Sequence, residues 1–180
     1  LTVGLSISCE TAAVFWSAKL LNEQAPSLAA VAGLGTAFYG ICNAGMRFYG
    51  DSLRARHGEM IVLLTSIVLA MAGFAILGLS TSFAVSVVAF ACAGLGLSLL
   101  CPCLFNMAAN QMPANRAAAL GFISMIAGAP RIMAPWLFGW VAASQSTSFA
   151  FGLCTFALAT AFGLVMLLKS TGFEASATAA

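Results

Sequence analysis

The amino-acid sequence predicts an all-α membrane protein with six transmembrane helices. Of its 180 residues, 62% are hydrophobic and only 7% are charged, whereas about 25% of the residues in a soluble domain are charged. The mean hydropathy is +1.02. The chain also divides into six apolar runs, each close to the roughly 20 residues that a helix needs to cross a bilayer. Because lipid cannot satisfy open backbone groups, runs of this length are expected to be helices.

Short polar segments separate the six runs. They are NEQAPS at 22–27, the charged stretch around 48–59, STS at 80–82, NQMPANR at 110–116 and SQSTS at 144–148. No Asp, Glu, Lys, Arg or His occurs between Glu59 and Arg116, and this stretch is too long for one crossing, so it must fold back at STS. The predicted spans are roughly 1–20, 27–47, 60–79, 83–108, 117–142 and 148–168. The polar tail, 169–180, is expected to be disordered.

The distribution of Lys and Arg predicts that both ends of this segment are cytoplasmic. With six spans, the loops at 48–59 and 109–116 lie on the same side as the two termini. Of the basic residues outside the span centres, the other side holds only Lys19. The side of the termini holds Arg47, Arg54, Arg56, Arg116 and Lys169. A multi-pass protein of the plasma membrane, in a bacterium the inner membrane, is therefore expected. The net charge of +2 is small and scattered, which gives no reason to expect a nucleic-acid partner.

Two charged residues lie well inside predicted spans, away from the span ends, and a charge at the bilayer centre costs about 2.5–3.5 kcal/mol on insertion scales. Glu10 lies within the first span, and Arg131 lies near the middle of the fifth, between Pro130 and Pro135. Such residues usually face a cavity or a partner. Both are candidates for a substrate or proton pathway, although a neutral hydrogen-bonded acid or a structural ion pair would also explain them. Asn43 and Asn106 are weaker candidates, because hydrogen bonds between helices explain amides equally well.

The six cysteines all lie inside predicted spans, where cysteine behaves as a small apolar residue. The triplet CPC at 101–103 resembles the intramembrane metal site of copper-transporting P-type ATPases. Nothing in the chain resembles the large cytoplasmic domain that such pumps require. No metal, no cofactor and no enzymatic activity are therefore predicted.

The segment RFYGDSLRARHG at 47–58 resembles the cytoplasmic loop between the second and third helices of a six-helix half in the major facilitator superfamily. Many members read G-R-x-x-G-D-x-L-x-x-R-x-G there. The matching residues are Arg47, Gly50, Asp51, Leu53, Arg56 and Gly58. Ser52 and Ala55 stand where the family commonly has a second basic and an acidic residue. In the family, contacts of this loop latch the two halves in one orientation and release during alternating access.

Two helical segments extend the resemblance over nearly the whole chain. CETAAVFWSAKLL at 9–21 is similar to the first helix of the C-terminal half in a sugar-permease-like subgroup, through Glu10 and the Trp16–Ser17–Ala18 pattern. APWLFGWVA at 134–142 is similar to the close of the fifth helix, with matches at Pro135, Leu137, Gly139 and Trp140. The resemblance implies half of a twelve-helix transporter, arranged as two inverted three-helix repeats.

The hypothesis that follows is secondary active transport of a small polar solute by alternating access, driven by a proton gradient. Its partners would be the lipid bilayer, a missing N-terminal six-helix half, the small-molecule substrate and protons. The first residue is Leu and no basic region precedes the first apolar run, so the chain is expected to be a fragment. Two alternatives remain open. One is a self-contained six-helix protein acting as a homodimer, and the other is a non-transporting membrane scaffold or thiol-active enzyme.

Overall fold

In the computed structural model of the protein, residues 1–170 are described, and they are almost entirely helical. Seven α-helices and two short 3-10 helices make up this part of the chain. In order, they are α1 (Thr2–Gln24), η1 (Pro26–Val31), α2 (Leu34–His57), α3 (Glu59–Leu79), α4 (Phe83–Leu97), α5 (Leu100–Gln111), η2 (Pro113–Asn115), α6 (Arg116–Ser144) and α7 (Thr147–Ser170). The predicted tail begins at Lys169, which belongs to α7, and its remaining residues 171–180 lie outside the described part.

Five segments of the described chain are long and apolar enough to cross a membrane: 26–57, 59–79, 83–111, 113–144 and 147–170. The first predicted span corresponds to α1, which is not among them. It carries Glu10, Lys19 and Glu23, which lower its hydropathy. Many residues of α1 are nevertheless buried, because it packs against α2, α6 and α7. Helix α1 is thus less hydropathic than the other spans, and it is packed inside the bundle.

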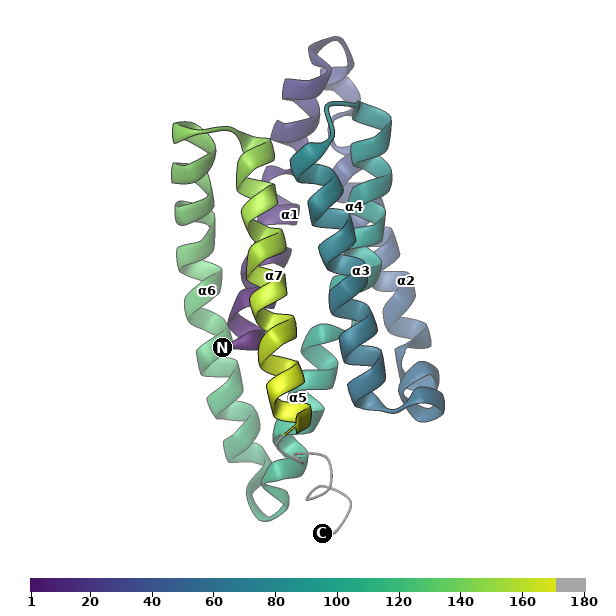
Figure 1. Ribbon diagram of the computed structural model, residues 1–180, viewed down its shortest axis with the longest axis vertical. Coiled ribbons are helices and arrows are strands. Elements are labelled where there is room, and N and C mark those ends of the chain that lie inside the picture. Colours follow the sequence, from purple (N-terminus) through teal and green to yellow (C-terminus); the bar gives the residue numbers. More distant parts are fainter. Residues whose placement is uncertain (171–180) are drawn as a thin grey trace.

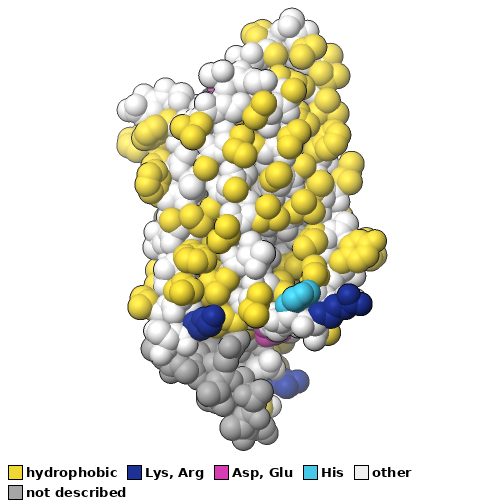
Figure 2. Space-filling view, turned by 45° about the vertical axis from the view of Figure 1, so that its right-hand side comes forward, with side chains coloured by type: hydrophobic (Ala, Val, Ile, Leu, Met, Phe, Trp, Pro, Cys, Tyr) yellow, Lys and Arg dark blue, Asp and Glu magenta, His cyan; other side chains and the backbone are white. Residues whose placement is uncertain are grey.

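The helices run roughly along one long axis, and consecutive spans alternate in direction (Figure 1). The α2–α3 connection, the α5–α6 connection and the end of α7 lie at the lower end of the molecule in this view. The connections α1–α2, α3–α4 and α6–α7 lie at the upper end. On the face shown in Figure 2, hydrophobic side chains cover most of the length, and the Lys and Arg side chains gather near the lower end. On this face, the basic side chains therefore lie near one end of the bundle.

The core is centred on phenylalanines contributed by four helices. Phe151 of α7 stacks on Phe74 of α3, with the ring centroids 6.1 Å apart, and meets Phe90 of α4 edge-on at 5.5 Å. Phe138 of α6 completes the cluster at 4.9 Å from Phe151. Edge-to-face and offset aromatic pairs of this kind add about 0.5–1.5 kcal/mol each beyond their burial. This cluster holds α3, α4, α6 and α7 around a common centre.

The structure corrects one expectation, which is that residues 48–59 form a loop. Helix α2 continues without a break to His57, and α3 begins at Glu59. The segment contains no proline, and Arg54, Arg56 and His57 occupy the last turn of α2, where positive charge complements the helix dipole. The only turn residue is Gly58, with φ 81° and ψ 153°. Arg47 therefore lies ten residues inside a helix, about 15 Å from its end.

The segment 83–108 was expected as one span, and it lies within 83–111, one of the five apolar segments, whose helix is interrupted at Ser98 and Leu99 between α4 and α5. Pro102 explains the position of this break. A proline cannot donate a backbone hydrogen bond to the carbonyl four residues earlier, and its ring crowds that carbonyl; here that residue is Ser98. Gly50 of α2 lies directly against Leu99, and a Cβ at residue 50 would collide with the Leu99 side chain. The break is thus packed closely against α2.

Candidate functional site

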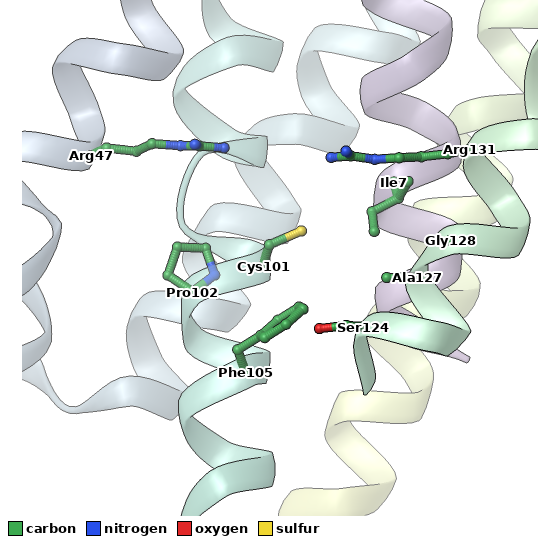
Figure 3. Close-up of a pocket in the computed structure, with 9 residues that line it drawn as sticks. All are labelled: Ile7, Arg47, Cys101, Pro102, Phe105, Ser124, Ala127, Gly128 and Arg131. Carbon is green, nitrogen blue, oxygen red and sulfur yellow. The ribbon is translucent and has the colours of Figure 1, made fainter. Parts of the chain in front are cut away.

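A pocket of about 420 Å³ lies between α1, α2, α5 and α6 (Figure 3). Arg47 of α2 lies on one side, and Arg131 and Ser124 of α6 lie on the other. The lining residues are Ile7, Arg47, Cys101, Pro102, Phe105, Ser124, Ala127, Gly128 and Arg131. The α5 residues of the lining, Cys101, Pro102 and Phe105, come shortly after the break at Leu99. Pro102 therefore both interrupts the helix and lines the pocket.

The two guanidinium groups of the pocket extend toward each other from opposite walls (Figure 3). Arg131 lies 15 residues after Arg116 and 13 before Ser144, the two ends of α6, hence near the middle of that helix. Its side chain makes no salt bridge within the described part of the chain. Arg131, a candidate from the sequence for the substrate or proton pathway, lines this pocket.

Glu10 is the acidic partner of this region. A carboxylate oxygen of Glu10 on α1 lies 3.8 Å from a guanidinium nitrogen of Arg47, whose side chain is 52% exposed, whereas that of Glu10 is 24% exposed. Glu10 is one helical turn from Ile7, which lines the pocket. Arg47 was expected to mark the cytoplasmic side, and sequence reasoning missed it as a pocket residue. Its pairing with Glu10 ties α2 to α1 beside the cavity.

Asn43, another candidate, lies one helical turn before Arg47 on α2. It is 8% exposed, and its side-chain amide donates to the hydroxyl of Tyr39 at 3.5 Å. Tyr39 is itself buried, and its backbone lies close against Gly94 of α4. Asn43 is therefore adjacent to the pocket along α2, in the contact between α2 and its neighbours, and it does not line the cavity.

Asn106 lies elsewhere, in a second polar cluster near the lower end of the bundle. Its side-chain amide donates to Glu59 Oε1 at 3.0 Å, which links α5 to the first turn of α3. Arg54 of α2 lies 3.9 Å from the same carboxylate oxygen and also donates to Asp51. These four residues, Asp51, Arg54, Glu59 and Asn106, are called the end network below. Sequence reasoning missed Glu59, although its place directly after the turn glycine was a usable signal.

The loop-motif residues serve several structural purposes. Asp51 accepts a hydrogen bond from Arg54. Leu53 packs against the hydrophobic core, and Arg56 is exposed. Gly50, a residue of the expected loop, lies within α2 and allows the approach of Leu99. Only Gly58 forms the turn.

The six cysteines are free thiols. Cys9 of α1 and Cys154 of α7 are both buried, and the Cys9 thiol donates to the Cys154 backbone carbonyl at 3.6 Å. Cys101 lines the pocket, while Cys103 is buried in the core. The CPC triplet therefore does not present its two thiols to one site.

Comparison with known proteins identifies the family. The family model of the Major Facilitator Superfamily matches residues 2–178. The chain belongs to the major facilitator superfamily. A curated relative, an uncharacterized MFS-type transporter of Yersinia pestis, is 32% identical over 151 residues, which cover 81% of this chain and 38% of the relative. The chain thus spans 38% of the length of that relative.

Family membership and the apolar helices together make this a multi-pass membrane protein. The relative is named as an MFS-type transporter. The apolar surfaces of these helices are suited to contact with lipid.

Proposed function

We propose that this chain is the C-terminal six-helix half of a secondary active transporter, closest to a sugar-permease-like subgroup. The transporter moves a small polar solute across the membrane by alternating access between two six-helix halves, and proton movement drives the transport. Glu10 and Arg131 act in the substrate or proton pathway, with Arg47 beside them. The partners are the N-terminal half, the solute and protons.

The observation that carries this proposal is the convergence of Arg47 and Arg131 on one pocket. In a chain with so few charges, charged side chains that meet around a cavity within the bundle are the expected mark of a solute or ion pathway. The helices that bring them there, α2 and α6, also belong to the least buried of the five apolar segments. Their exposed faces offer a surface that a second half could cover.

Helix packing supports the proposed inverted repeats. With α4 and α5 taken together as one span, a two-fold axis in the membrane plane would relate α1 to α4–α5, α2 to α6 and α3 to α7. Such an axis requires matching contacts. Helix α2 packs against α4 as α6 packs against α1, and α3 packs against α7. These pairings are the ones that two inverted three-helix repeats would produce.

The proposed location is the plasma membrane, in a bacterium the inner membrane, with both ends of this segment in the cytoplasm. The α2–α3 turn, the α5–α6 turn and the end of α7 share one end of the bundle (Figure 1), and the Lys and Arg side chains on the face shown in Figure 2 lie near that end. By the positive-inside rule, that end would face the cytoplasm.

Uptake measurements on the full-length protein test the function. Cells that overproduce it are compared with a deletion strain for uptake of radiolabelled sugars and other small polar solutes, with and without a protonophore. Glu10→Gln and Arg131→Ala are expected to reduce uptake of the transported solute by more than about tenfold, with unchanged amounts of protein in the membrane fraction. Unchanged uptake in both variants would rule out the site, and uptake that ignores the protonophore would rule out proton coupling.

A further inference from the structure

We propose that the pocket between α1, α2, α5 and α6 binds a small anion, one that carries a carboxylate or phosphate group. Arg131 is the main anion-binding residue, and Arg47 is the second. The inference rests on the proposed function, because it names the substrate class of the same site.

The charge balance around the pocket carries this inference. Two guanidinium groups line the cavity, and no carboxylate does. The one acidic neighbour, Glu10, lies 3.8 Å from Arg47 and stands outside the lining. Within residues 1–170, Arg131 has no acidic partner. The site therefore contains one positive charge more than its surroundings neutralise.

The position of Arg131 makes this excess meaningful. It lies near the middle of α6, where its guanidinium cannot simply reach the water beyond a helix end. Arginine inside a membrane segment pairs with an opposite charge or faces a water-filled cavity. A guanidinium also cannot lose its proton, so the charge must be met by an anion or by water. An anionic solute would supply the missing charge.

The geometry suits an anion held from two sides. Arg47 and Arg131 extend toward each other at similar depth in the pocket (Figure 3). Guanidinium groups bind carboxylates and phosphates through paired, charge-assisted hydrogen bonds. The Ser124 hydroxyl on the same wall as Arg131 adds a neutral donor. A volume of about 420 Å³ lies within the usual range for small-molecule sites.

A neutral sugar fits these groups less well. Its hydroxyls could accept hydrogen bonds, but they would leave Arg131 without a counter-charge. The aromatic surface on which sugars often stack is limited here to Phe105. The apolar residues that fill the rest of the lining, among them Ile7 and Ala127, suit the carbon skeleton of an organic anion.

The test compares ligands that share one scaffold and differ in charge. Full-length transporter in detergent is titrated with glucose, gluconate and glucose 6-phosphate, and with succinate and inorganic phosphate as anions without a sugar skeleton. Calorimetry gives the dissociation constants, and thermal melting gives the stabilisation. At least one anion is expected to bind about tenfold or more tightly than glucose. Equal or better binding of glucose, or no binding by any of the four anions, would overturn the proposal.

Variants then place the anion on Arg131. Arg131→Gln is expected to weaken binding of that anion by about tenfold or more, and Arg131→Lys to weaken it less, because the charge remains. Arg116→Gln is the matched control, since it removes the same charge from the exposed start of the same helix and should leave binding unchanged. Unchanged anion binding in a folded Arg131→Gln protein contradicts the proposal. The proposal is also contradicted if the ligand-free variant melts at a lower temperature but still binds the anion as tightly as the wild type. That result would assign Arg131 to a carboxylate of the other half.

The outcomes also separate this inference from the proposed function. If solute uptake depends on Glu10 and Arg131 but none of the anions binds, transport stands and the anionic substrate class falls. If an anion binds through Arg131 but no solute is taken up, the binding site stands and the transport proposal falls.

Discussion

The pocket and the end network use the same residue types in opposite ways. Both contain an arginine of α2 near a carboxylate of another helix, Arg47 near Glu10 and Arg54 near Glu59. In the end network, Arg54 has two acidic neighbours, and Glu59 also accepts from Asn106. In the pocket, Arg47 has one acidic neighbour, Glu10, and Arg131 has none within residues 1–170.

The difference lies in how the charge is balanced. Arg47 and Arg54 are seven residues apart, about two turns of α2, so they project from similar faces at different heights. At the lower height, Arg54 of α2 lies between Asp51 and Glu59, and Asn106 of α5 donates to Glu59 of α3, so contacts link three helices, although Arg54 Nε has no hydrogen-bond partner. At the upper height, Arg131 lines the pocket and has no acidic partner within residues 1–170. We infer that the first arrangement stabilises the fold and that the second is kept for a ligand.

Matched substitutions of Arg131 in the pocket and Arg54 in the end network give the largest expected contrast between an effect on uptake and an effect on stability. Arg131→Gln should reduce uptake of the transported solute by more than about tenfold with little effect on stability. Arg54→Gln should lower the free energy of unfolding by about 1–3 kcal/mol, because the partly buried Glu59 carboxylate loses its charged neighbour. Uptake assays and thermal melting of both full-length proteins measure the two effects.

The comparison breaks if the two variants behave alike. Equal losses of stability would mean that Arg131 is a structural residue. Normal stability in Arg54→Gln would mean that the end network contributes little, as exposed ion pairs often do. Asp51 is the member that most invites this second outcome, since its side chain is 88% exposed.

Gly58 offers a way to disturb the end network without touching its charges. Its φ of 81° and ψ of 153° lie in a region that is essentially restricted to glycine. Gly58→Ala should therefore destabilise the protein by about 1–3 kcal/mol and shift Glu59 relative to Arg54. Nothing lies within 4 Å of the added Cβ, so the effect would come from backbone strain alone. Gly33→Ala is a suitable control in thermal melting, because residue 33 is also open but has an ordinary φ of −64°. Equal melting of the two variants would show that the turn relaxes without strain.

Much of the helical architecture follows from hydropathy, but the course of α2 does not. The long apolar runs predicted helices because lipid permits little else. The charged stretch after Arg47 was assigned to a loop because charge in a membrane protein normally marks the end of a span. Charge and helicity are separate properties, however, and a segment with arginines, no proline and one glycine can continue a helix beyond the apolar part. Attention to the true breaker, Gly58, would have placed Arg47 inside the bundle.

Only some of the candidate site residues that the sequence suggested line the pocket. Arg131 was identifiable as an isolated charge in an apolar helix, and it lines the pocket. Asn106 was expected in the same pathway, but its side chain contacts Glu59 of α3. A proline's effect on the preceding turn depends on its surroundings, since Pro130 and Pro135 lie within the uninterrupted helix α6. Side-chain pairing across helices is a tertiary property that spacing along one chain does not determine.

The smallest expected effect concerns Glu10 and is the most specific to the pocket. If a bound anion uses Arg47, then Glu10 competes with it for the same guanidinium. Glu10→Gln would remove that competition, so the anion should bind about two- to fivefold more tightly, the range expected from a partly exposed ion pair. Solute uptake should nevertheless fall, because the proposed proton-carrying group is gone. Calorimetry with the anion that binds wild-type protein most tightly measures the first effect, and Glu23→Gln is the matched control on the same helix. Weaker anion binding in Glu10→Gln would instead make Glu10 a residue that positions Arg47 for the ligand. The Glu10–Arg47 pair would then belong to the anion site and would not compete with the anion.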